Sequence, residues 1–281
     1  MEATSFQAIQ KIADHIQKLV KLKPSVGIIA GTGLGVLATV VEPKHTIAYK
    51  HIPGFPQTTV AGHDGNLVFG MIAEKAVVIM QGRFHHYEGF SAEQIVLPIR
   101  VLKLLGVETL LISNAAGGLS KNLEVGDFVI LTDHISLAGL TTDNVLVGPN
   151  DEHFGPRFPD IADAYCPQLR RLMQAVAGDL GLGDRVHTGV YFHTIGPSYG
   201  TKAENRMLIQ LGGNVVGMST VPEVVVARHC GMRVFAISVV TSMCNPDLQI
   251  SEPTTHEDVL DAAKSSAKDL MRLFLELIRR M

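Results

Sequence analysis

The sequence predicts a single α/β domain, residues 1–281, built on a mostly parallel or mixed β-sheet that helices cover on both faces. The chain is 46% hydrophobic and 18% charged, which is enough apolar material for one large core. Short apolar runs recur along it, and helical patterns alternate with them. No linker-like, repetitive or low-complexity tract divides the sequence. One domain is therefore the expectation.

Buried strands are predicted from the apolar runs. Each run is short, rich in β-branched residues, and of a length that suits a strand covered on both faces. The runs are VGIIA (26–30), AVVIM (76–80), TLLIS (109–113), FVILTDHI (128–135), GVYFHTI (189–195), NVVGMS (214–219) and RVFAISVVTS (233–242).

Helices are predicted where apolar residues recur at helical spacing or follow a capping signal. The N-terminal segment from Phe6 to Val20 has this spacing and does not resemble a signal peptide. A C-terminal helix is predicted from about Glu257 to the end of the chain. Capping boxes open three further helices, at Ser91 with Gln94, Thr201 with Glu204, and Thr220 with Glu223.

Charge and cysteine content exclude several classes of function. The formal net charge is -3 and no basic run is present, which argues against a nucleic-acid partner. Cys166, Cys230 and Cys244 lie far apart, so neither a disulfide framework nor a zinc site is expected. No apolar run approaches the roughly 20 residues that cross a bilayer. We expect a soluble, cytoplasmic protein without a membrane partner.

The segment GTGLG (31–35) follows the first predicted strand and suits an anion. Its glycines bring backbone N–H groups close to a ligand, and Thr32 adds a hydroxyl donor. It does not match a dinucleotide fingerprint, because Val36 stands where the third glycine is required, and it lacks the lysine of a Walker loop. A tight turn without a ligand is the alternative.

The segment GRFHHYEGF (82–90) follows the second predicted strand and supplies cationic groups. Arg83 offers a planar fork of donors that suits phosphate, and His85 adds another donor. Basic groups at the end of a buried strand are costly without a ligand or partner. A structural ion pair between Arg83 and Glu88 is the alternative.

Two more segments end strands with anion-binding features. In SNAAGGLS (113–120), Ala115 and Ala116 present little but backbone. In GMSTVPEV (217–224), Ser219 lies at a predicted helix N-terminus, which favours negative charge. Ligands of open α/β sheets gather at the carboxyl ends of strands. The four segments together therefore predict one phosphate site.

Three further features remain candidates for ligand contacts. His63 lies in TVAGHDGN, and His256 stands at the start of the last helix. The alternatives are a hydrogen-bonded structural role for His63 and an exposed position at the helix N-terminus for His256. In GPSYGTKAE (196–204), Tyr199 can stack on a flat ligand, and Gly200 follows it directly.

These segments, in this order, resemble the trimeric purine nucleoside phosphorylases and the related methylthioadenosine phosphorylases. The resemblance covers nearly the whole chain and includes VGPNDEHFGPRFPD and VGMSTVPEVVVARHCG. It implies a mixed, partly barrel-like sheet, a homotrimer, and phosphorolysis, in which inorganic phosphate attacks the anomeric carbon and releases a base and a pentose 1-phosphate. No metal or organic cofactor is implied; phosphate is the co-substrate.

The resemblance also implies roles for individual residues. Phe158 would reach into a neighbouring subunit's site. Chemistry would depend on His85, Ser242 and His256. Phosphate would be held by Thr32, His63, Arg83, His85, Ala115 and Ser219. The sugar would contact Tyr87, Phe158, Met218 and His256. The base would lie among Ala116, Tyr199, Gly200, Val216, Thr241, Ser242, Asn245 and Asp247.

The chain departs from the family at the base. Purine-specific members have a glutamate at the position of Gly200 and an asparagine at that of Ser242. Each lost hydrogen bond to a buried substrate costs about 1–3 kcal/mol. We therefore expect altered or broadened base specificity, with Asn245 or Asp247 as alternative base contacts.

Other functions stay open at this point. They are a catalytically weak relative that binds nucleosides, a methylthioadenosine- or pyrimidine-preferring phosphorylase, and, more distantly, a dinucleotide-dependent oxidoreductase. His256 favours ordinary nucleosides over methylthioadenosine, because a polar ring suits a 5′-hydroxyl.

Overall fold

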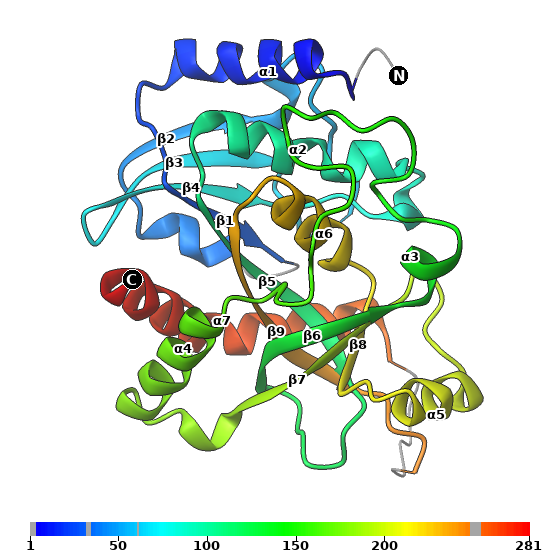
Figure 1. The fold of residues 1–281 in the computed structure, drawn as a ribbon. Coiled ribbons are helices and arrows are strands. Elements are labelled where there is room, and N and C mark those ends of the chain that lie inside the picture. The colour runs from blue at the N-terminus through cyan, green and yellow to red at the C-terminus, as the bar shows by residue number, and fades with distance from the viewer. Residues whose placement is uncertain (1–3, 32–34, 61, 248–253) are drawn as a thin grey trace.

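The computed structural model describes residues 4–31, 35–60, 62–247 and 254–281. Within these residues, nine strands form one mixed sheet in the order β2-β3-β4-β1-β5-β8-β7-β6-β9 (Figure 1). The strands are β1 (Val26–Ala30), β2 (Glu42–Ala48), β3 (Asn66–Ile72), β4 (Lys75–Gln81), β5 (Thr109–Gly118), β6 (Phe128–Ser136), β7 (Val186–His193), β8 (Val215–Gly217) and β9 (Arg233–Met243).

Half of the sheet is open and half is closed into a barrel. In the open half, β1 lies parallel to both β4 and β5, while β2, β3 and β4 are antiparallel neighbours. Because β5 also pairs in parallel with β9, the strands β5, β8, β7, β6 and β9 close on themselves. The predicted mixed, partly barrel-like α/β fold is therefore confirmed.

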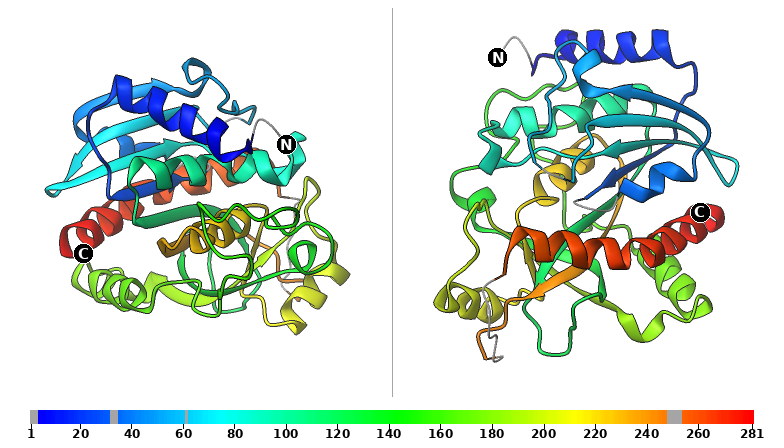
Figure 2. Two further views of the ribbon diagram at one scale, coloured as in Figure 1. Left: turned by 45° about the horizontal axis from the view of Figure 1, so that its top comes forward. Right: turned by 180° about the vertical axis from the view of Figure 1, so that it is seen from behind.

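Helices cover both faces of this sheet, each over its own apolar core (Figures 1 and 2). One core joins α1 (Phe6–Leu19), α2 (Ala92–Leu105) and α6 (Val221–His229) to the sheet. The other joins α4 (Pro167–Asp179) and α7 (His256–Arg280) to the opposite face. The shorter helices α3 (Leu137–Thr141) and α5 (Lys202–Gln210) follow β6 and precede β8, respectively.

The predicted capping boxes are confirmed at α2 and α5 but not at α6. The hydroxyls of Ser91 and Thr201 each accept a hydrogen bond from the backbone N–H three residues later. Thr220 makes no such bond and has a φ of 71°. Its hydroxyl instead accepts from the Asn114 amide at 3.0 Å, and Glu223 pairs with Arg83. The predicted cap was wrong because both side chains are recruited by the neighbouring site.

The sequence prediction also misplaced the segment NAAGG. The predicted strand ended at residue 113, but β5 continues to Gly118. Glycine and alanine are poor strand formers in isolation. Here the segment is held between partners, because β9 pairs along its whole length and β8 pairs with its last two residues.

The helices, the cysteines and the possible metal ligands can each be compared with the sequence analysis. None of the helices in the described ranges is both long and apolar enough to cross a membrane. Cys166, Cys230 and Cys244 are all free thiols. No group of three or more His, Cys, Asp or Glu side chains in the described part of the chain is placed to hold a metal ion.

Candidate active site

A cavity of about 450 Å³ opens at one end of the barrel. Its walls come from the ends of β5, β7, β8 and β9, from the loop after β4, from residues 194–200, and from the first turns of α5 and α7. It collects most of the predicted site residues: Arg83, His85, Tyr87, Ala115, Ala116, Tyr199, Gly200, Val216, Met218, Ser219, Thr241, Ser242 and His256.

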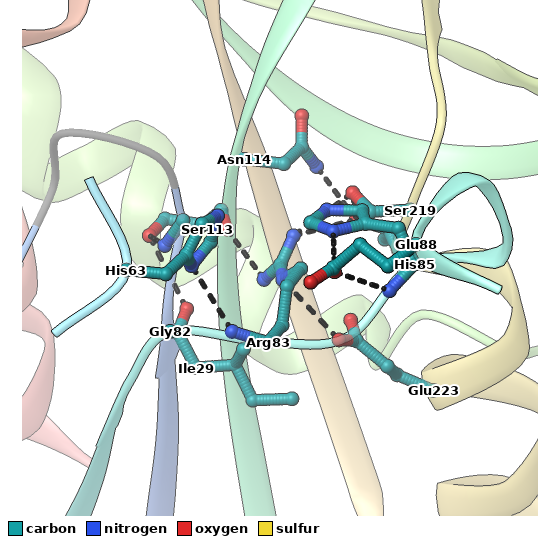
Figure 3. Close-up of polar contacts among 12 residues, drawn as sticks. Ile29, His63, Gly82, Arg83, His85, Glu88, Ser113, Asn114, Ser219 and Glu223 are labelled. Carbon is teal, nitrogen blue, oxygen red and sulfur yellow. Dashed lines mark hydrogen bonds and ion pairs between the residues drawn. The ribbon is translucent and has the colours of Figure 1, made fainter. Parts of the chain in front are cut away.

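Arg83 joins three of the predicted phosphate-binding segments (Figure 3). Its side chain is only 2% exposed, and its Nη1 donates to the Ser219 hydroxyl at 2.9 Å. Nη2 donates to the carbonyl oxygen of Ser113 at 2.7 Å. Nε lies 3.2 Å from Oε1 of Glu223, which makes this the buried counter-ion. The alternative pairing with Glu88 is not found, because Glu88 is engaged elsewhere.

The first glycine-rich segment reaches the same place. The Gly31 N–H donates to the Ser113 hydroxyl at 3.3 Å. A Cβ at position 31 would lie 2.7 Å from the Ser113 carbonyl oxygen, so the approach of β1 to β5 requires glycine there. Thr32, the predicted hydroxyl donor, lies outside the described residues.

His63 packs behind Arg83 in a fixed tautomer. The backbone N–H of Arg83 donates to His63 Nδ1 at 3.1 Å, so the neutral ring carries its proton on Nε2. Burial, with the nearby His85 and Arg83, lowers the pKa of His63 from 6.5 to about 3. His63 is not among the cavity-lining residues but its ring lies 5.4 Å from that of His85. It is therefore a neutral N–H donor at neutral pH.

His85 is oriented by Glu88. Its Nδ1 lies 2.9 Å from Glu88 Oε1, and the other carboxylate oxygen accepts from the backbone N–H and hydroxyl of Thr59. Burial raises the pKa of Glu88, but the hydrogen bonds from His85 and Thr59 outweigh it and the net shift is downward. Burial lowers the pKa of His85 despite the carboxylate. The Tyr87 ring stacks on His85 with centroids 4.5 Å apart.

Not every predicted contact lies at the cavity. Asn245 is turned away and donates to the Leu119 carbonyl oxygen at 2.7 Å. Asp247 forms an ion pair with Lys121 at 3.0 Å. Phe158 is 87% exposed, outside the cavity of its own chain. The structure thus joins Gly200 and Ser242 in one wall without either alternative base contact.

Several polar residues at this site escaped the sequence prediction. Asn114, His193, Thr194, Ser198, Glu204 and Asn205 all line the cavity. His193 lies within a strand that was predicted only as a buried apolar run, and alternation along that strand was the available signal. Asn114 follows the predicted run 109–113 and stands in the segment SNAAGGLS, where only its alanines were singled out. His193 Nδ1 lies 2.9 Å from the Ser136 hydroxyl, while its Nε2 is buried without a partner in the described residues.

Two of the buried histidines, His63 and His193, have the lowest pKa values and predict a pH dependence of stability. Burial, reinforced by His86, lowers the pKa of His193 to about 3, as burial does for His63. Below pH 6.5 the unfolded chain therefore binds protons that the native chain excludes. The free energy of unfolding should fall with pH by up to about 1.4 kcal/mol per unit for each ring.

Urea unfolding of the wild type at pH 7.5 and 5.5, beside His63→Asn and His193→Asn, measures this effect. Each variant replaces a titrating ring by a neutral amide and should reduce the pH dependence. An unchanged difference between the two pH values in both variants would contradict the assignment of neutral, buried rings.

The chain is similar to a known protein family, to curated proteins and to solved structures. The profile of the "Phosphorylase superfamily" matches residues 25–279. Purine nucleoside phosphorylase 1 of Geobacillus stearothermophilus is 46% identical over 98% of this chain and 97% of its own length. A crystal structure of Schistosoma purine nucleoside phosphorylase with hypoxanthine is 51% identical, with a TM-score of 0.95 and coverage of 99% and 98%.

A third relative differs in its ligand. Isoform 2 of purine nucleoside phosphorylase from Schistosoma mansoni, in complex with cytosine and ribose-1-phosphate, is 46% identical. The match has a TM-score of 0.95 and covers 99% of this chain and 98% of that one.

Proposed function

This chain belongs to the phosphorylase superfamily, and we propose that it is a nucleoside phosphorylase whose choice of base extends beyond the 6-oxopurines. Its relatives establish the reaction class, a pentosyl transfer of the purine nucleoside phosphorylase type. The finer assignment is supported by one observation: the contacts of Arg83, the proposed phosphate ligand, with Ser219 and Ser113 are in place, whereas Gly200 and Ser242 line the proposed base end of the cavity.

Phosphate would bind where the four segments meet. Arg83 and the Ser219 hydroxyl supply donors at one point of the cavity wall, and the buried Glu223 keeps the guanidinium in place. Neutral His85, with its Nδ1 proton held by Glu88, offers the lone pair of Nε2 to a proton of the phosphate. An anion fixed under the sugar in this way stabilises an oxocarbenium-like transition state by position and by charge.

The sugar and base would occupy the rest of the cavity. Tyr87, Met218 and His256 are the proposed sugar contacts, and all three line it. The base would lie beside Tyr199, between Ala116, Val216 and the loop at Thr241 and Ser242. With glycine at 200, no carboxylate at that position fixes a purine ring N–H. The relatives described above bind hypoxanthine and cytosine, and this range supports the proposal.

A substrate panel tests the proposal. Inosine, guanosine, adenosine, methylthioadenosine, uridine and cytidine are incubated with and without phosphate, and base and pentose 1-phosphate are quantified. We expect phosphate-dependent release from at least one purine nucleoside and from adenosine or cytidine. Turnover restricted to inosine and guanosine would refute the broadened specificity, and binding without any turnover would refute the enzyme.

We also propose a homotrimer in which Phe158 completes a neighbouring site. Phe158 is 87% exposed, and the large apolar side chains Leu140 and Val147 on the same connection are 78% and 74% exposed. Exposed apolar groups in such numbers favour a protein contact. Leu137 and Ile195 are also exposed apolar residues, and both line the cavity, so the exposed apolar surface extends to it.

Replacement of Phe158 by alanine tests this arrangement. The KM for nucleoside should rise by about tenfold or more, because the sugar loses an aromatic wall, while light scattering still reports a trimer. Leu211→Ala, at another exposed apolar residue away from this connection, is the matched control and should leave the KM unchanged. A monomeric wild type with full activity would contradict the shared site.

A further inference from the structure

Position 200 has no side chain, and the side chain of Asn205 lies in the space beside it. Gly200 precedes Thr201, the N-cap of α5. Side chains in a helix point back toward its N-terminus, so residues of the first turn cover the cap. Asn205 stands on that turn, with its backbone N–H bonded to the Thr201 carbonyl oxygen at 2.9 Å. Its carboxamide is therefore directed toward Gly200.

The contact between the two residues is close. A Cβ built on Gly200 would lie 2.5 Å from Oδ1 of Asn205 and 3.4 Å from its Cγ. The carboxamide thus occupies the space that any side chain at position 200 would enter first. Glycine at 200 and this placement of Asn205 depend on each other.

The side chain of Asn205 is largely buried, and its carboxamide has no hydrogen-bond partner among the described residues. Asn205 is only 8% exposed, and it lines the cavity beside Tyr199 and Gly200. Because Asn205 lines the cavity, a ligand or water there can satisfy the amide, whose donors and acceptor would otherwise be costly to bury. Glu204 is the other polar side chain here, but it is solvated and bound to the backbone N–H of Thr201 at 2.7 Å.

We propose that Asn205 is the residue that reads the base, an inference that rests on the proposed phosphorolysis. A carboxamide presents one donor and one acceptor side by side. It can accept from N1–H and donate to O6 of a 6-oxopurine, or, turned over, donate to N1 and accept from the amino group of adenine. The donor–acceptor edge of cytosine suits it equally. A carboxylate, which only accepts, cannot make these exchanges.

Two substitutions separate reading of the base from a structural role. Asn205→Ala removes both groups, and Asn205→Asp keeps the shape but leaves only acceptors. The matched control is Arg206→Ala, at the next position of α5, whose side chain is exposed and does not line the cavity. Each protein is assayed for phosphorolysis of inosine, adenosine and cytidine, and in reverse for the KM of free base and of ribose 1-phosphate.

We expect Asn205→Ala to raise the KM of the free base about tenfold or more while the KM of ribose 1-phosphate stays within about twofold. Asn205→Asp should shift the ratio of inosine to adenosine turnover toward inosine, because the acceptor survives for N1–H but the donor to adenine N1 is lost. Arg206→Ala should match the wild type in both respects.

The outcomes distinguish this inference from the proposed function. If the wild type releases bases with phosphate but both Asn205 variants keep its base KM and its substrate ratios, Asn205 does not read the base. Equal increases in both KM values, with a lower melting temperature, would assign it a structural role and overturn the inference. No phosphate-dependent release by the wild type would instead refute the phosphorylase itself.

Discussion

Arg83→Met should abolish phosphorolysis and destabilise the protein at the same time. The guanidinium supplies donors for the proposed anion, and loss of one fixed donor of this kind costs about 10²–10³ in kcat. The same substitution leaves the carboxylate of Glu223, 3% exposed, buried without its counter-ion. Removing one member of a buried pair costs roughly 3–5 kcal/mol. Steady-state kinetics and urea unfolding measure the two effects separately.

A second substitution separates stability from activity. Arg83→Met combined with Glu223→Leu removes both charges, so the free energy of unfolding should recover to within about 2 kcal/mol of the wild type. Activity should stay absent, because the anion site has lost its donors. Recovery of phosphorolysis in the double variant would show that Arg83 serves only as a structural partner of Glu223.

Gly200→Glu, Ser242→Asn and Asn205→Ala in one chain should convert the protein to a 6-oxopurine enzyme. The glutamate restores an acceptor for the purine ring N–H and the asparagine a contact to the leaving base, each contributing about 1–3 kcal/mol. We expect kcat/KM for inosine to rise by about tenfold or more and that for cytidine to fall. Asn205 is replaced by alanine because its carboxamide occupies the space that the glutamate side chain at position 200 would enter.

The stepwise variants control this design. Gly200→Glu alone should be less stable than the triple variant, since its Cβ would lie 2.5 Å from the Asn205 oxygen. Gly200→Glu with Ser242→Asn should improve inosine turnover, but less than the triple variant. Inosine turnover that is unchanged or lower in the triple variant would mean that the base lies elsewhere in the cavity.

Much of the fold was predictable because buried strands are encoded locally. The cores of β1, β4, β5, β6, β7 and β9 coincide with the apolar runs. Edge strand β2 was missed because its sequence, EPKHTIA, is exposed at five consecutive positions and has no apolar run. Closure of the barrel depends on pairing between β5 and β9, which no local pattern in either strand reveals.

The anion side of the site was more predictable than the base side. Glycines, an arginine and hydroxyls at strand ends are the groups that bind phosphate in proteins, so Arg83 and Ser219 were predicted from residue type and position, and the structure brings them into contact. The counter-ion was not, because Glu223 stands in a typical capping box and only the tertiary contact redirects it to Arg83.

Asn205 shows why the base side was harder. A polar residue inside a predicted amphipathic helix ordinarily faces solvent. Asn205 can be buried because Gly200, five residues earlier, has no side chain. This dependence appears only in the folded turn. The same holds for Asn245, which looked available for a ligand but donates to the Leu119 carbonyl oxygen.

A crystal structure of the protein grown with phosphate and hypoxanthine tests the central claim, that distant loops build one anion cradle beneath a nucleoside site. Electron density for phosphate should place its oxygens within hydrogen-bonding distance of Arg83, His85 and Ser219. The base should lie between Tyr199 and Asn205 at the far end of the same cavity. Phosphate bound elsewhere on the molecule, with this cavity holding only solvent, would contradict it.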